Sequence, residues 1–262
     1  MDEEYITEAQ AKLAQDTTSV PEFWVNKYRN EAAKNWDKFY KRNTTNFFKD
    51  RHWVEREFNE LRCQSEGNNM PLTKVLEVGC GVGNFVFPVL EANDHLYFYA
   101  CDFSARAIEF VKAHPGYNSG RCHAFVCDLT KDPLTDEVPA DTVDLVSMIF
   151  VLSAIPPEKM VEAVRNVYRV LKPNGKVLFR DYGIYDAAQL RFKPGSKLCE
   201  NFYVRQDGTM AYYFSEEMLK QIFTDAGFQP MSSEYVMRKT TNVKSNIEVD
   251  RIFVQAKFMK PA

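Results

Sequence analysis

Three glycines at alternate positions give the clearest indication of chemistry in this sequence. Gly79, Gly81 and Gly83 directly follow a short apolar run at residues 74–78. Glycine allows a sharp backbone turn and lets a ligand approach without meeting a Cβ atom. In an α/β sheet, the first turn from strand to helix is where nucleotide-like cofactors bind. The GxGxG spacing differs from the GxGxxG of dinucleotide-binding proteins and so disfavours a dinucleotide-dependent oxidoreductase.

Two carboxylates fall where such a cofactor needs hydrogen-bond acceptors. Asp102 follows the apolar run at residues 96–101, and a carboxylate there can accept from two ribose hydroxyls. Asp128 follows the run at residues 122–126 and can accept from an adenine amino group, while Leu129 packs on the ring. Either aspartate alone could simply cap a helix. In register with the glycines, the pair predicts a site for a cofactor that contains a nucleoside.

The elements that must position these residues alternate between short apolar strands and helices. This alternation predicts an α/β domain with a mostly parallel seven-stranded sheet and helices on both faces. The last two strands are expected to be antiparallel. The predicted strands are 74–78, 96–101, 122–126, 143–150, 176–181, 234–238 and 251–258, and the helices are 84–91, 105–113, 157–171 and 215–226.

Two regions fall outside this alternation. Residues 1–64 carry aromatic residues at helical spacings and predict helices, and residues 65–71 have the composition of a loop. We therefore predict an N-terminal helical extension at 1–70 and a Rossmann-like domain at 71–262. Residues 183–212 are rich in Gly, Pro, Arg and aromatic side chains and are expected to form an insertion on the substrate side.

The charge is unevenly distributed although the net charge is only −3. Bases exceed acids by four in residues 27–62, by six in 165–205 and by four in 238–260, whereas acids exceed bases by six in 91–144. Such basic segments would attract a polyanion such as RNA, although they are equally compatible with an ordinary solvated surface.

The six cysteines include no pair with CxxC spacing, which indicates a reducing compartment. Cys122, His123 and Cys127 lie close in sequence, but no second ligand pair accompanies them, so no metal site is expected. The acidic N-terminus lacks a signal-peptide pattern, and no apolar run could span a membrane. We expect a protein of the cytoplasm, with the nucleus as an alternative, and no membrane partner.

Glu77, the glycines, Asp102, Asp128 and Leu129 together resemble the class I S-adenosylmethionine-dependent methyltransferases. Further motifs resemble the eukaryotic tRNA N3-methylcytidine methyltransferase family, over nearly the whole chain from about Glu31. They are NWDKFY at 35–40, NFFKDRHW at 46–53, FVLSA at 150–154, FRDYG at 179–183 and NFYVRQDGT at 201–209. This resemblance implies S-adenosylmethionine as cofactor and transfer of its methyl group to cytidine 32 of the tRNA anticodon loop. Shorter members of the family, which this chain resembles, act on serine tRNAs with seryl-tRNA synthetase as a helper, and no DNA partner is expected.

The resemblance and the residues together give a set of candidate site residues. Trp36 and Tyr40 share one helix face and are expected to cover the cofactor, with Ile149 beside it. Asp181, at the end of the fifth strand, is the candidate catalytic residue, because a carboxylate there could accept from the cytosine amino group and stabilise the cationic product. The candidates for base stacking or phosphate contact are Phe47, Phe48, Arg51, His52, Arg180, Tyr182, Arg191, Lys193, Lys197, Tyr203 and Arg205.

Two other functions use the same sequence features. A methyltransferase for a small molecule would share the cofactor motif but would not need basic flanking segments. A non-catalytic RNA-binding subunit would keep the fold, but a damaged glycine turn would be expected, and here the turn is intact.

Overall fold

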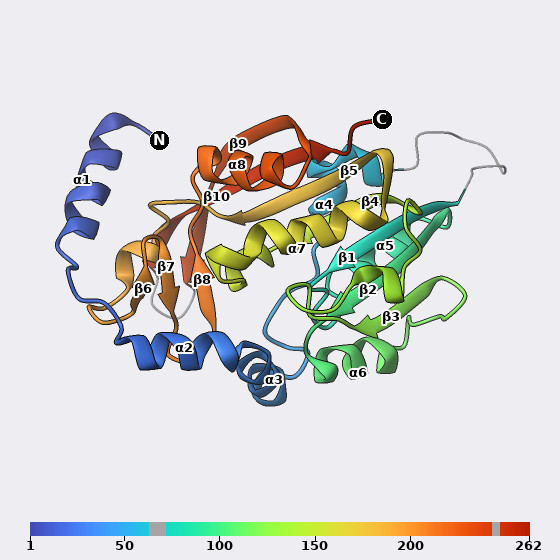
Figure 1. Cartoon of the computed structure of the whole chain (residues 1–262), viewed down its shortest axis with the longest axis horizontal. Helices are drawn as coiled ribbons and strands as arrows, with labels where there is room; N and C mark the ends of the chain where they lie inside the picture. Colours follow the sequence, from blue (N-terminus) through green and yellow to red (C-terminus); the bar gives the residue numbers. More distant parts are fainter. Residues whose placement is uncertain (63–71, 243–246) are drawn as a thin grey trace.

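A seven-stranded sheet runs through the protein (Figure 1), and the computed structural model describes residues 1–62, 72–242 and 247–262. The strand order is β3-β2-β1-β4-β5-β10-β9, with β1 to β5 parallel and β10 antiparallel to both its neighbours. The predicted mostly parallel sheet is confirmed. Its strands are β1 (Thr73–Val78), β2 (Leu96–Asp102), β3 (Cys122–Val126), β4 (Val143–Ile149), β5 (Leu171–Tyr182), β9 (Gln229–Asn242) and β10 (Ile247–Met259).

The two closing strands are longer than the sequence indicated. Residues 253–259 of β10 pair with β5, whereas residues 247–252 pair with β9 alone. The extra length is therefore a two-stranded hairpin that continues past the edge of β5. Its mixed polar and apolar composition is the reason that the apolar pattern located only its inner part.

Helices cover both faces of the sheet, because both faces are apolar. Along β1, Leu76 and Val78 point into one core, under α7 and α8, while Val75 points into the other, under α5 and α6. This period of two is the geometry of a strand that is buried on both sides. The helices are α5 (Val86–Ala92), α6 (Ala105–Ala113), α7 (Pro157–Val170) and α8 (Glu216–Asp225), with short 3₁₀ turns at η2 (Leu134–Asp136) and η3 (Leu152–Ala154).

The predicted insertion forms a separate three-stranded antiparallel sheet. Its strands β6 (Lys197–Cys199), β7 (Phe202–Val204) and β8 (Met210–Tyr212) follow the 3₁₀ turn η4 (Gln189–Arg191). The N-terminal helix α1 (Glu3–Ala14) lies against the same region, because Tyr5 Oη donates to the carbonyl of Tyr185 at 2.7 Å.

The N-terminal region is helical but interrupted, as α1, α2 (Glu22–Asn30), α3 (Ala32–Asn43), α4 (Val54–Glu57) and the 3₁₀ turn η1 (Asn59–Leu61). Figure 1 shows α2 and α3 along one edge of the molecule, away from both termini. The loop predicted at 65–71, and with it the proposed boundary near residue 70, lies outside the described residues.

Two negative findings apply to the part of the chain that the structure describes. No helix there is both long enough and apolar enough to cross a membrane. No group of three or more His, Cys, Asp or Glu side chains there is placed to hold a metal ion. His123 instead faces Glu137, with Nε2 and Oε2 2.9 Å apart, and the thiols of Cys122 and Cys127 are buried.

Candidate cofactor and substrate site

The glycine turn between β1 and α5 adopts a conformation that side chains would prevent. Gly79 and Gly81 both have positive φ values, +61° and +55°. A Cβ atom on Gly79 would lie 2.5 Å from Val151 Cγ2, and one on Gly81 would lie 3.0 Å from Tyr40 Oη. The turn therefore needs glycine both for its backbone angles and for the close approach of α3 and of the loop after β4.

Asp102 holds this turn from the end of β2. Its Oδ2 accepts from the backbone N–H of Gly81 at 3.0 Å, and its Oδ1 accepts from that of Ser104 at 2.9 Å. Burial raises the pKa of Asp102 to about 6, while these two hydrogen bonds oppose the shift. Each oxygen can accept a further hydrogen bond, and Asp102 lines the neighbouring cavity, where ribose hydroxyls could donate.

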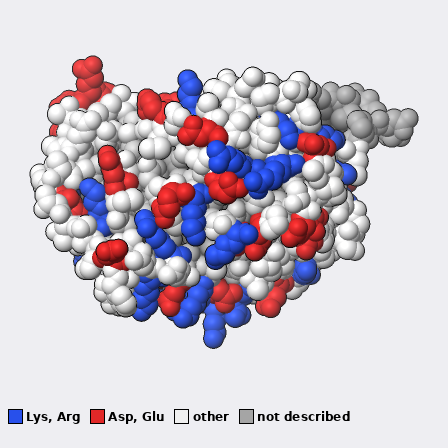
Figure 2. All heavy atoms as spheres, viewed as in Figure 1, with Lys and Arg blue, Asp and Glu red and all other residues white. Residues whose placement is uncertain are grey.

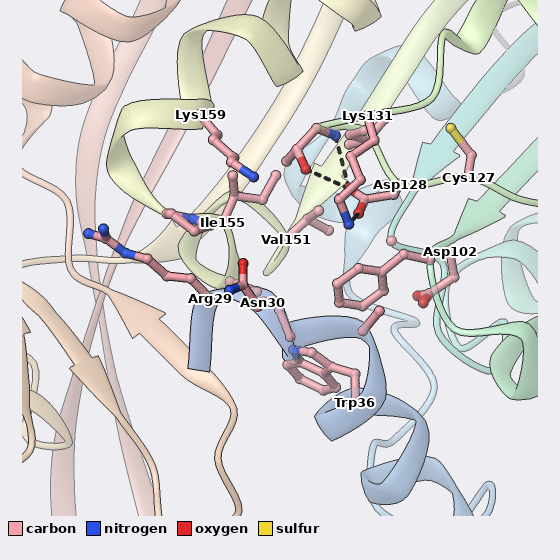
Figure 3. A pocket seen from close by; sticks show the side chains of 18 of the residues that line it. Arg29, Asn30, Trp36, Asp102, Cys127, Asp128, Lys131, Val151, Ile155 and Lys159 are labelled. Atoms are coloured by element: carbon pink, nitrogen blue, oxygen red, sulfur yellow. Dashed lines mark hydrogen bonds and ion pairs between the residues drawn. The ribbon is translucent and has the colours of Figure 1, made fainter. Parts of the chain in front are cut away.

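A cavity lies between the carboxyl ends of the strands and the helices α2 and α3 (Figure 3). We call it the cofactor cavity. It brings together Gly79, Asp102, Asp128, Leu129 and Trp36, all predicted from the sequence to bind the cofactor. Its other walls include Phe103, Phe150, Val151, Ile155, Arg29, Lys131 and Lys159.

Asp128 lies in this cavity with its oxygens already hydrogen-bonded. Its Oδ1 accepts from the Thr130 backbone and hydroxyl, and its Oδ2 accepts from Lys131 Nζ at 2.8 Å. These partners lower the pKa of Asp128 against the effect of its burial. The carboxylate is thus held ionised at the cavity wall, as an acceptor for an amino group requires.

The helix α3 covers the glycine turn. Trp36 and Tyr40 both line the cofactor cavity, and Tyr40 is buried over Gly81. Asp37, the residue after Trp36 on α3, accepts from Ser104 Oγ at 3.0 Å, and its Oδ2 lies 3.4 Å from Arg106 Nε. Ile149 differs from the expectation, because its side chain packs in the core under α5 and its carbonyl accepts from Arg51 Nη1 at 3.1 Å. The next two residues, Phe150 and Val151, line the cofactor cavity instead.

Glu77 is buried at the end of β1 and lines a second cavity. Its Oε2 has no hydrogen-bond partner within residues 1–62, 72–242 and 247–262. Burial raises the pKa of Glu77 to about 8, although the nearby charge of Arg51 opposes the shift. An unpartnered carboxyl next to the glycine turn fits the ammonium group at the methionine end of S-adenosylmethionine.

We expect this arrangement to make cofactor binding dependent on pH. Below its pKa of about 8, Glu77 keeps its proton, and pairing with an ammonium group requires that this proton leave. We therefore expect S-adenosylhomocysteine to bind several-fold more tightly at pH 7.5 than at pH 6.0, with release of a proton. Calorimetry in buffers of different ionisation enthalpy measures both effects. The Glu77→Gln variant should release fewer protons and show a flatter pH profile, and an unchanged profile would contradict the assignment.

The second cavity adjoins the first. Its part beside Glu77 and Gly81 would hold the methionine end of the cofactor, and we call the cavity the substrate cavity after the other residues that line it. The two cavities share five residues, Trp36, Tyr40, Gly79, Phe150 and Ala154. Four of the predicted substrate residues line the second cavity: Phe48, Arg51, Tyr182 and Arg205. The ring of Tyr182 lies 5.1 Å from that of Phe150 and 5.5 Å from the Arg205 guanidinium, so aromatic and cationic groups meet there.

The prediction for Asp181 needs correction. The side chain is fully buried and lines neither cavity. Its Oδ2 accepts from the backbone N–H of Ser153 at 3.0 Å, and its Oδ1 accepts from that of Tyr182 at 2.9 Å. Burial raises the pKa of Asp181 to about 6. Because Ser153 and Tyr182 both line the substrate cavity, Asp181 positions the wall rather than touching the base.

Several other predicted substrate residues also lie elsewhere. His52 is exposed and lines neither cavity, whereas its neighbour Trp53 lines the substrate cavity. Arg180 is buried, with its guanidinium 4.4 Å from the Trp53 ring and 5.2 Å from that of Phe253, so packing rather than phosphate accounts for it. Burial also lowers its pKa to about 10.

The remaining candidates belong to the insertion or to the surface. Tyr203 is buried in the small sheet and stacks on Phe192 at 4.6 Å, so it is not available to a base. Arg191 and Lys193 are exposed and Lys197 is half-buried, all outside the two cavities. Phe47 is 58% exposed and packs edge-on against Phe48.

The aromatic and cationic residues of the substrate cavity that were not predicted from the sequence include Trp53, Phe150, Arg251 and Phe253. Phe253 lies opposite Tyr182 in the pairing of β10 with β5, and Arg251 lies two residues earlier on the same face. The alternation of residues 251–255 could have placed Arg251 and Phe253 on one face. It could not have shown that this face meets Tyr182.

Comparison with known proteins places this site in a family. Residues 76–177 match the model of a methyltransferase domain. The chain is 58% identical to the mouse (Mus musculus) tRNA N(3)-cytidine methyltransferase METTL6 over 255 residues, which cover 97% of this chain and 90% of that protein. It is 45% identical to the tRNA N(3)-methylcytidine methyltransferase trm141 of Schizosaccharomyces pombe, over 93% of this chain and 98% of that protein.

The chain belongs to the tRNA N3-cytidine methyltransferase family. The family predicted from the sequence motifs is thereby confirmed.

Solved structures agree on the fold. An S-adenosylmethionine-dependent methyltransferase from Anabaena variabilis has a TM-score of 0.62 at 12% identity, covering 87% of this chain and 94% of its own. The 1,6-didemethyltoxoflavin-N1-methyltransferase of Burkholderia thailandensis has a TM-score of 0.59 at 11% identity, covering 90% of both chains. At these identities the likeness concerns the fold alone, and it is that of the class I methyltransferases.

Proposed function

We propose that this protein transfers a methyl group from S-adenosylmethionine to N3 of a cytidine in tRNA. The observation that carries the proposal is the junction of the two cavities in a member of this family. The nucleoside acceptors Asp102 and Asp128 line one cavity, and the aromatic and cationic groups suited to a nucleotide line the other. Their shared residues, Gly79 and Phe150 among them, mark where a donor and an acceptor would meet.

The chemistry asks mainly for alignment. S-adenosylmethionine supplies an electrophilic methyl group on a sulfonium, and the acceptor must lie in line with it. Cytosine N3 keeps a lone pair at neutral pH, so the residues need not remove a proton from it. The walls formed by Tyr40, Phe150 and Tyr182 would orient the base and exclude water. The methylated ring is cationic, and aromatic faces such as those of Phe150 and Tyr182 would stabilise its developing charge.

The target base has to leave its stack before it can enter the substrate cavity, because N3 lies on the pairing edge. Phe48 at the cavity wall and Phe47 on the adjoining surface offer aromatic rings for it or its neighbours. Arg205 and Arg251, whose guanidinium groups lie 5.5 and 5.7 Å from the Tyr182 ring, would contact phosphate or the cytosine carbonyl.

The finer assignments follow the resemblance of the sequence motifs to the short members of the family. We place the target at position 32 of the anticodon loop of serine tRNAs, with seryl-tRNA synthetase as a partner that raises activity. We place the enzyme in the cytoplasm, with the nucleus as a second location, consistent with the free thiols of Cys80, Cys101, Cys122 and Cys127 in its core.

The proposal is tested with the purified protein, labelled S-adenosylmethionine and total tRNA from a strain that lacks the gene. After digestion, the label should appear in 3-methylcytidine. Added seryl-tRNA synthetase should increase the yield and concentrate the label in serine tRNA. Label in a different nucleoside would contradict the assignment to cytidine N3. If the synthetase did not increase the labelling of any tRNA, the assigned partner would be wrong.

A further inference from the structure

The helix α3 has two faces with different properties. Its inner face carries Trp36, Phe39 and Tyr40, which cover the glycine turn. Trp36 and Tyr40 line both cavities, and Phe39 packs beneath them. Lys34, Lys38 and Lys41 follow each other at spacings of four and three, so they share the opposite face, and all three are exposed. One short helix thus separates the cofactor cavity from a row of lysines.

This row has little compensating negative charge. Lys34 lies 3.3 Å from Glu31, whereas Lys38 and Lys41 form no ion pair with any residue that the structure describes. Arg42, next along the helix, is 3.9 Å from Asp207. Figure 2 shows Lys and Arg side chains, with some Asp and Glu side chains among them, along the lower edge of the molecule, where Figure 1 places α2 and α3. Like charges three and four residues apart repel each other and destabilise a helix.

The apolar attachment of α3 to the domain is small. Phe39 and Tyr40 form a minor apolar cluster with Val82 and Ala107, separate from the two main cores. The N-terminus of the helix has no side-chain cap, and its polar links to the domain are those of Asp37 with Ser104 and Arg106, of Asn35 Nδ2 with the Gly208 carbonyl at 3.1 Å and of Arg42 with Asp207. An element with few buried apolar contacts opens at a lower free energy than the core does.

We propose that the row formed by Lys34, Lys38 and Lys41 binds RNA phosphates, and that this binding stabilises α3 in its place over the cofactor. The proposal rests on the proposed function for the identity of the RNA as tRNA. Phosphates neutralise the lysines and remove the repulsion that opposes the helix. Since Trp36 and Tyr40 on the inner face form the wall of the cofactor cavity, the stabilised helix retains the cofactor more tightly.

Thermodynamic linkage makes this coupling reciprocal. If tRNA tightens the binding of the cofactor by some factor, the cofactor tightens the binding of tRNA by the same factor. Couplings of this kind typically lie between roughly 5-fold and 150-fold. With such a coupling, the enzyme keeps its cofactor while RNA is bound and releases the spent cofactor after the RNA leaves.

The test measures the Kd of S-adenosylhomocysteine by calorimetry, alone and with a saturating tRNA anticodon-arm transcript that carries cytidine at position 32. The wild-type protein should bind at least about 5-fold more tightly with the RNA. The variant K34Q/K38Q/K41Q keeps good helix formers but removes the charge. It should bind S-adenosylhomocysteine alone at least as tightly as the wild type, because the repulsion is already removed, and the RNA should no longer tighten this binding.

A matched variant serves as control. K12Q/K112Q/K220Q also removes three exposed lysines, on α1, α6 and α8, and should keep the full coupling. The slope of log K for the RNA against log salt should fall in magnitude by about 2 to 3 in the α3 variant. Absence of coupling in the wild-type protein, or full coupling in the α3 variant, would overturn the proposal. Formation of 3-methylcytidine is measured separately, so a failure of the proposed function is distinguished from a failure of the coupling.

Discussion

The Asp181→Asn variant is expected to lose most of its turnover at saturating cofactor and tRNA while still folding. Both carboxylate oxygens of Asp181 accept backbone N–H groups, from Ser153 and Tyr182. Asparagine offers one acceptor and one amino group, so one of these buried N–H groups would face another donor. A buried group left unsatisfied costs about 1–3 kcal/mol, and the free energy of unfolding should fall by this amount. Because Ser153 and Tyr182 line the substrate cavity, their displacement should lower kcat at least about tenfold.

The pH profile distinguishes this positioning role from a merely structural one. Burial holds the pKa of Asp181 at about 6, so its second acceptor is lost as the pH falls through that value. The kcat of the wild-type enzyme should therefore decline below pH 6, and that of Asp181→Asn should not. Asp144→Asn is the control, because Asp144 also accepts a backbone N–H, from Lys74 at 2.8 Å, but near the start of β4. If Asp181→Asn destabilised the protein and left kcat unchanged, as expected of the control, the positioning role would be wrong.

The Asp102→Asn variant should lose cofactor binding. Asp102 accepts from the N–H groups of Gly81 and Ser104, which lie on the two turns that enclose the cofactor cavity. The asparagine side chain has one oxygen that accepts and one amino group that donates, so its two ends cannot both accept from these N–H groups. A loss of about 1–3 kcal/mol corresponds to roughly 5-fold to 150-fold in Kd. Calorimetry with S-adenosylhomocysteine measures this directly.

The matched comparison for Asp102→Asn is Asp128→Asn. Two of the partners of Asp128, the Thr130 hydroxyl and the Lys131 ammonium, are on mobile side chains that can turn to the remaining amide oxygen. Its Kd should therefore rise by a smaller factor than that of Asp102→Asn. The reverse order would contradict the assignment of Asp102 as the residue that shapes the cavity.

The cofactor half of the site was largely predictable from the sequence because its signals are local. Gly79, Gly81 and Gly83 lie within five residues, and Asp102 and Asp128 each follow directly on an apolar strand. The parallel topology then brings the carboxyl ends of neighbouring strands together without further information. The same local reasoning placed Ile149 at the end of β4. The residue beside the cofactor cavity is instead the next one, Phe150, because the backbone there turns to a positive φ of 59°.

The substrate half was less predictable because its residues come from distant and irregular segments. The loop at 44–53 has no periodicity, so nothing in the sequence shows that Trp53 faces the cavity and His52 faces solvent. Arg251 and Phe253 reach Tyr182 only through the register of β10 against β5. The position of Asp181 at the end of β5 was predicted, but its direction depends on the backbone of Ser153, 28 residues away in sequence.

The central claim is that cytosine N3 is the methyl acceptor, and a substitution in the RNA tests it most directly. Two anticodon-arm RNAs would be compared, one with cytidine and one with 3-deazacytidine at position 32, each with labelled S-adenosylmethionine and the wild-type protein. The deaza base keeps the ring shape and the amino group but has a C–H in place of the N3 lone pair. We predict transfer of one methyl group to the first RNA and none to the second. Equal methylation of both would show that the acceptor is another atom and would contradict the account.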